Sequence, residues 1–165
     1  MAYVRTPRNT GQLAAVDQPV SFDHRHHARD DGIECLYCHA DAERSPSAGL
    51  PSTETCMGCH SQVWNDSILL EPVRRSYFAD RPLPWNRVHD LPDFVYFDHS
   101  AHLRGGLECA TCHGQVENMA SVVQVAPLTM VWCLDCHREP EARGLSPTGL
   151  EGKVTRLTTC TTCHR

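Results

Sequence analysis

Fifteen residues of this 165-residue chain have the types and spacing needed for covalent heme attachment. All ten cysteines fall into five C-x-x-C pairs, and a histidine directly follows each pair. Two thiols at this spacing can add to the two vinyl groups of one porphyrin, and the next residue can then bind the iron. The attachment residues are Cys35, Cys38, Cys56, Cys59, Cys109, Cys112, Cys133, Cys136, Cys160 and Cys163, and the proximal ligands are His39, His60, His113, His137 and His164.

Two other uses of paired cysteines fit the pattern less well. A disulfide framework or a redox dithiol gives no reason for a histidine after every second cysteine. A four-cysteine zinc site joins two C-x-x-C knuckles, so five knuckles would leave one without a partner. The sequence therefore predicts five covalently bound heme c groups with their irons as cofactors.

Two segments of the chain repeat one unit. Residues 22–39 read FDHRHHARDDGIECLYCH, and residues 97–113 read FDHSAHLRGGLECATCH. A second C-x-x-C-H follows each unit after a spacer, which gives repeats of about 21–60 and 97–137 and leaves the fifth motif outside both. The paired histidines of each unit stand at i and i+3, side by side on a helical turn, so each can point to a different iron.

Five six-coordinate irons would need five distal ligands, and six histidines lie outside the motifs. The repeat selects four of them, namely His24, His27, His99 and His102. For the fifth place, His89 is the first choice because it lies outside both repeats, and Met119 or Met130 is the second choice. A methionine there would raise the heme potential relative to two histidines. His26 is disfavoured because its neighbours already occupy that turn.

Composition bounds the fold and the partners. Eleven prolines and ten glycines favour a mostly irregular and helical chain with little β structure, wrapped around a five-heme core that it needs in order to fold. We expect an arm over residues 1–20 and one pentaheme domain over 21–165. Residues 61–80 are the best helix candidate, broken or kinked at Pro72, and residues 114–132 could form a short strand or a packing loop. The net charge of −5, which heme propionates would make more negative, argues against nucleic acid.

Location follows from the chemistry of attachment. Heme c is attached outside the cytoplasm, so an export signal is expected, either removed or encoded before residue 1. The sequence has no run of eighteen apolar residues and so no transmembrane segment of its own.

Irons with both axial positions filled leave no place for substrate. Such a protein transfers electrons and has no catalytic residue, so we predict that it is not itself an enzyme. A multiheme reductase with one open heme is less favoured, because candidate ligands outnumber the vacant positions. A free-standing periplasmic electron carrier or a filament subunit would also be compatible with these motifs.

Residues 18–165 resemble the pentaheme cytochrome c subunit of bacterial alternative complex III. The likeness lies in SFDHRHHARDDGIECLYCH, TETCMGCHSQV, PLTMVWCLDCHREP, LTTCTTCHR and the stretch from residue 84 to 114. Residues 87–97, RVHDLPDFVYF, are its most specific part, since heme attachment alone does not demand them. The two repeats also resemble diheme units of the cytochrome c3/c7 type.

The resemblance implies a subunit of a quinol-oxidising membrane complex. Electrons would pass from quinol through an iron–sulfur protein to the five hemes. They would leave to a monoheme cytochrome c or another acceptor. The subunit would lie on the periplasmic face of the cytoplasmic membrane, docked through its iron–sulfur and membrane-embedded partners.

Overall fold

The computed structural model describes residues 6–140 and 154–164. Within these ranges the chain is mostly helical and irregular, as predicted, and contains no strand. The 114–132 segment is a loop, apart from the short η5 (Val116–Asn118) and the first residues of α7, and it makes one isolated antiparallel bridge between Val123 and Ala15. The described helices have at most nine residues, so loops set most of the path of the chain.

Five short helices carry the five C-x-x-C-H motifs. A spacing of three residues spans about one helical turn, so the two thiols of each motif lie on the same side of their helix. The helices are α2 (Cys35–Cys38), α3 (Thr53–His60), α6 (Cys109–His113), α7 (Met130–Arg138) and α9 (Cys160–Cys163).

The remaining helices connect and orient these five. The α-helices are α1 (Pro7–Thr10), α4 (Glu71–Phe78), α5 (His99–Arg104) and α8 (Val154–Leu157). A π-helix, η2 (Arg25–Asp30), and the 3-10 turns η3 (Ala40–Glu43), η4 (Ile68–Leu70) and η5 add single turns. Asp98 caps α5 by accepting a hydrogen bond from the amide of Ala101.

The prediction of one helix over residues 61–80 is corrected by the structure. The segment forms a turn, then η4, and only then α4 from Glu71 to Phe78. Pro72 lies in the first turn of α4, where its missing N–H has no helical partner to lose. It therefore starts the helix instead of kinking it.

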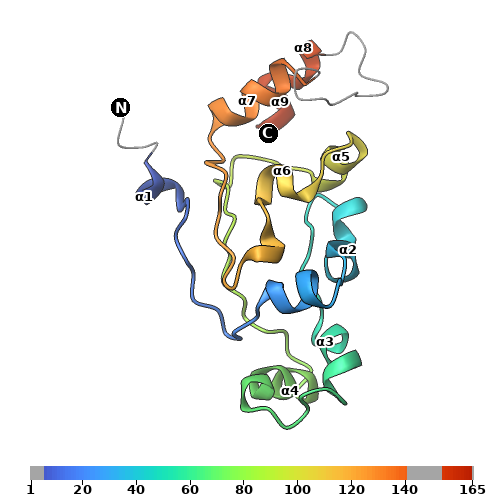
Figure 1. The fold of residues 1–165 in the computed structure, drawn as a ribbon. Coiled ribbons are helices and arrows are strands. Elements are labelled where there is room, and N and C mark those ends of the chain that lie inside the picture. The colour runs from blue at the N-terminus through green and yellow to red at the C-terminus, as the bar shows by residue number, and fades with distance from the viewer. Residues whose placement is uncertain (1–5, 141–153, 165) are drawn as a thin grey trace.

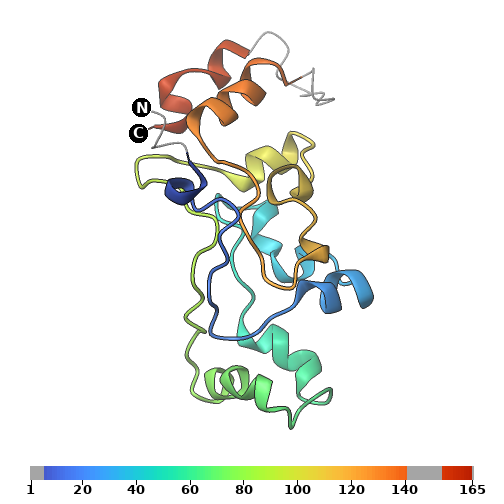
Figure 2. The ribbon, with the colours of Figure 1, turned by 60° about the vertical axis from the view of Figure 1, so that its left-hand side comes forward.

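The molecule is elongated, and its motif helices follow one another along the long axis. Figures 1 and 2 show α3 and α4 at one end, α2 above them, then α5 and α6, and α7 with α8 and α9 at the other end. Loops run lengthwise between these levels. The motif helices thus form a series that is not in sequence order, because α3 lies beyond α2.

The polypeptide provides only a small apolar core. Among the described residues, the buried hydrophobic side chains are Val20, Ala42, Leu70, Val73 and Ala126. Val20, Leu70 and Val73 form one cluster, against which Cys56 and Trp85 also pack. Within the same part of the chain, no helix is long and apolar enough to cross a membrane.

The described part of the N-terminal arm packs against the loop before α7. The Gln12 side chain donates to the Val125 carbonyl at 2.7 Å, and the Leu13 amide donates to the Gln124 carbonyl at 2.8 Å. The buried side-chain amide of Gln124 donates from Nε2 to the Thr10 carbonyl at 3.0 Å. These contacts fix residues 10–15 on their own chain.

Candidate heme-attachment and axial-ligand sites

Four of the five motif histidines are oriented by a backbone carbonyl. Because a carbonyl can only accept, Nδ1 of each must carry the hydrogen, and Nε2 keeps a lone pair for a metal. The bonds are His39 to Gly49 at 2.9 Å, His60 to Val63 at 3.0 Å, His137 to Leu157 at 2.9 Å and His164 to Phe94 at 3.0 Å.

Three of the four predicted distal histidines show the same orientation. Nδ1 of His27 lies 3.1 Å from the carbonyl of Asp23, and Nδ1 of His102 lies 2.7 Å from the carbonyl of Asp98. Nδ1 of His99 lies 2.7 Å from the carbonyl of Pro46. Each ring therefore also offers Nε2, the nitrogen that a second axial ligand would use.

A phenylalanine holds the two histidines of each repeat. The Phe22 ring stacks on His27 with centres 4.4 Å apart and meets the edge of His24 at 4.8 Å. Phe97 does the same with His102 at 4.3 Å and His99 at 4.8 Å. Sequence reasoning assigned these phenylalanines no role, although their recurrence at one position of both repeats was the signal that could have found them.

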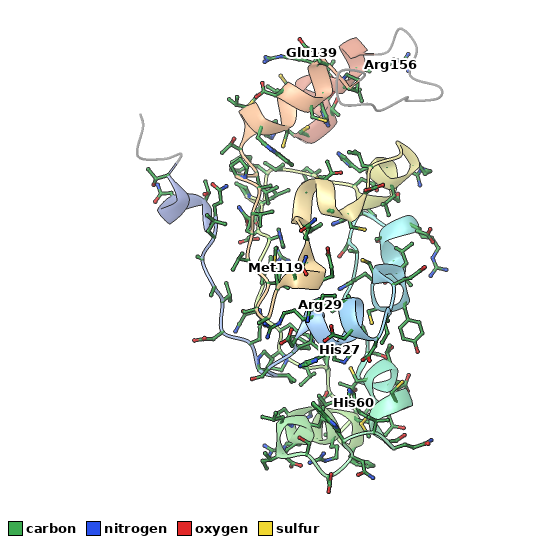
Figure 3. The ribbon with its side chains drawn as sticks, in the orientation of Figure 1. His27, Arg29, His60, Met119, Glu139 and Arg156 are labelled. Atoms are coloured by element: carbon green, nitrogen blue, oxygen red, sulfur yellow. The ribbon has the colours of Figure 1, made fainter. Side chains whose placement is uncertain are left out.

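Three predicted distal rings lie near motif histidines, and their ring centres are separated by a distance that suits an iron between them. A metal–imidazole bond of about 2.0 Å on each side places the two ring centres roughly 6 Å apart. The structure has His27 and His60 at 6.0 Å (Figure 3), His102 and His137 at 6.0 Å, and His99 and His113 at 6.3 Å. The first pair joins η2 to α3 and the second joins α5 to α7, whereas the third lies within the level of α5 and α6.

His24 differs from the other three predicted distal histidines. Its Nδ1 is buried, and among the described residues it is the buried side-chain polar atom without a hydrogen-bond partner. Burial first, and then His39, lower the pKa of His24. A buried imidazole nitrogen that lacks a partner is costly. The effect of His39 on the pKa indicates that His24 lies near the histidine of its own motif, and its role as a distal ligand stays a prediction.

The imidazoles at the centre of the molecule are held neutral. Burial, followed by His89, His99 and His39, lowers the pKa of His113 to about 4. Burial also lowers the pKa of His102. Only neutral imidazole can bind a metal, so at neutral pH both rings are ready to do so.

Neighbouring attachment sites lie close enough for their thiols to interact. Burial is the largest cause that raises the pKa of four of these thiols, and a cysteine of a neighbouring motif raises each pKa further. The four pairs, with the affected thiol first, are Cys56 and Cys38, Cys109 and Cys35, Cys112 and Cys136, and Cys133 and Cys163. The five motifs therefore form an unbroken series through space, α3–α2–α6–α7–α9, which agrees with the levels seen in Figures 1 and 2.

Comparisons with known proteins agree with this geometry. The model of the family described as "Cytochrome c7 and related cytochrome c" matches residues 95–165. The multiheme cytochrome c subunit of menaquinone reductase from Nitratidesulfovibrio vulgaris is 31% identical over 160 residues, which cover 90% of this chain and 68% of that relative. The chain belongs to the multiheme cytochromes c. Membership implies covalently bound heme c, and the paired thiols and free Nε2 atoms of this cytochrome fit that group.

The structure does not place the candidates for the fifth distal position around His164. His89 lies against His113, with ring centres 4.3 Å apart. Met119 follows η5 near the backbone of Gly114 (Figure 3), and Met130 is 62% exposed at the start of α7. The His164 ring has Phe94 beside it at 5.9 Å. The axial roles of His89, Met119 and Met130 stay predictions.

His26 is exposed on the surface of its helix. Its side chain is 62% exposed and pairs with Asp30 at 3.5 Å on the surface of η2. The expectation that its neighbours, and not His26, serve the irons stays a prediction.

Proposed function

We propose that this cytochrome is an electron-transfer subunit that relays electrons along five covalently bound heme c groups. The observation that supports it best is the unbroken series of neighbouring attachment sites, each with an oriented motif histidine. Within residues 21–165, which we propose to be one domain, each first histidine of a repeat would serve its own motif. Each second histidine would serve the next one.

The residues fit this role better than a catalytic one. Four motif histidines have a second imidazole nearby that could fill the other axial position, which leaves those irons no open site. The protein would then hold the macrocycles close together and tune their potentials through ligands, hydrogen bonds and burial.

We further propose that the cytochrome works in a quinone-linked complex at the periplasmic face of the cytoplasmic membrane. Its resemblance to the alternative complex III subunit supports a quinol-oxidising complex, with an iron–sulfur protein as donor and a monoheme cytochrome c or another carrier as acceptor. The relative from N. vulgaris bears the name of a menaquinone reductase. That name supports a second candidate, in which electrons run through the hemes toward the quinone.

One purification distinguishes these candidates. The tagged cytochrome, isolated from gently solubilised membranes of its own organism, should carry five hemes by intact-mass spectrometry. It should also copurify with an iron–sulfur subunit and polytopic membrane proteins. The complex should then reduce added cytochrome c with a quinol, or reduce a quinone with a reduced cytochrome donor. Recovery as a lone soluble cytochrome would contradict the assignment to a complex and favour a free carrier.

A further inference from the structure

The segment from His89 to Phe97 contacts three heme-binding sites, although heme attachment does not require it. The Phe94 carbonyl accepts the Nδ1 hydrogen of His164 at 3.0 Å, and the Tyr96 amide donates to the Cys163 carbonyl at 2.8 Å. Phe97 stacks on His102 at 4.3 Å. Orientation of ligands is therefore the role that the described contacts give this segment.

His89 extends this role to a third site, the motif on α6. Its Nε2 lies 3.2 Å from Nδ1 of His113, and the two rings meet edge to face at 74°. At the other four motifs, Nδ1 of the proximal histidine faces a backbone carbonyl. The motif on α6 is thus distinguished by a side-chain nitrogen in that position.

We propose that His89 is a positioning residue that accepts the Nδ1 hydrogen of His113, and that it is not an axial ligand as the sequence predicts. The inference rests on the proposed heme at Cys109 and Cys112. Nε2 of His89 faces His113 and is not free to reach an iron, and His99 already stands 6.3 Å from His113 at the separation that suits the opposite ligand.

The acceptor decides how electron-rich the ligand becomes. A neutral imidazole nitrogen is a stronger base than an amide carbonyl, so it draws the Nδ1 hydrogen of His113 more strongly. A hydrogen bond of this kind fixes the ring and raises the basicity of the metal-binding nitrogen. A more basic ligand stabilises ferric iron, and this site should therefore have a lower potential than it would with a carbonyl acceptor.

Three variants of the full-length holocytochrome test the proposal. His89→Ala removes the acceptor, and His89→Gln offers an amide oxygen in its place. His26→Ala removes an exposed histidine whose ion-pair partner is Asp30 on the surface of η2. The measurements are the iron spin states by electron paramagnetic resonance, and the heme midpoint potentials by optically monitored redox titration at one pH.

In His89→Ala every heme that is low-spin in the parent should stay low-spin, and the midpoint potential of one heme in five should rise. His89→Gln should show a smaller rise, and His26→Ala none. A new high-spin signal from one heme in five would overturn the proposal and make His89 an axial ligand. Unchanged potentials in both His89 variants would also overturn it. Fewer than five hemes in the parent protein would instead contradict the proposed function, so the two failures are distinct.

Discussion

The His99 imidazole donates its Nδ1 hydrogen to the carbonyl of Pro46, 2.7 Å away, and so joins the second repeat to the loop of the first. The backbone amide of His99 bonds to the same carbonyl at 3.2 Å. Three residues later, the carbonyl of Gly49 orients His39. One loop, residues 45–49, thus positions ligands for two different motifs.

Replacing Gly49 with alanine should disturb this loop more than a matched replacement elsewhere. Gly49 has φ +70°, and a Cβ there would lie 2.9 Å from Oδ2 of Asp41. Gly32 has φ +67° with open space around it, so Gly32→Ala carries only the backbone cost of about 1 kcal/mol. Denaturant unfolding should show a larger loss in the free energy of unfolding for Gly49→Ala than for Gly32→Ala. The heme absorption spectrum should change only in Gly49→Ala. Equal losses would contradict the role of the loop.

The pairing of His27 with His60 can be tested by combining variants. If both bind one iron, His27→Ala and the double variant His27→Ala/His60→Ala should each remove the low-spin signal of the same single heme. The combination His27→Ala/His39→Ala should remove two. Electron paramagnetic resonance with spin quantitation gives the number of low-spin hemes in each variant, and His26→Ala serves as the control. Loss of two low-spin hemes in the first double variant would show that the pairing is wrong.

The Phe97 ring should contribute to stability and to ligand geometry. Phe97→Ala removes the stacking on His102 and the edge contact with His99, so we expect a loss of about 2 kcal/mol in the free energy of unfolding. Phe78, which is 78% exposed, serves as the control, and Phe78→Ala should change stability by at most about 0.5 kcal/mol. Phe97→Ala should also alter the resonance signals of two hemes. An effect no larger than that of Phe78→Ala would argue against this role.

Stability should fall as the pH drops from 6.5 to 4. The pKa of His113 is about 4 in the folded chain, below the usual 6.5, so the unfolded chain binds more protons within this window. The free energy of unfolding therefore rises with pH between 4 and 6.5. The stability associated with His113 is fully present above pH 6.5 and is lost below pH 4, a change of about 3 kcal/mol. Binding of iron to Nε2 acts in the same direction. Unfolding midpoints in denaturant that stay constant over this range would contradict the prediction.

The sequence by itself determined the chemistry of attachment. C-x-x-C-H places all its reactive groups within five residues, so the heme sites, the proximal histidines and the paired histidines of the repeat are visible without a fold. The high content of proline and glycine predicted the irregular, helical architecture in the same local way. The predicted kink at Pro72 is wrong because proline occurs both where a helix breaks and in the first turn of a helix, and the surrounding residues do not distinguish the two.

Only the tertiary structure decided which of these groups meet. His27 and His60, like His102 and His137, belong to different segments, and nothing in the local sequence brings their rings to 6.0 Å. The contact of Cys35 with Cys109, and hence the order of the motif helices in space, depends on how loops fold around one another. His89 is predicted as a ligand because its residue type suits an iron. Its Nε2 lies 3.2 Å from Nδ1 of His113, the contact on which the proposed positioning role rests, and that contact depends on the fold alone.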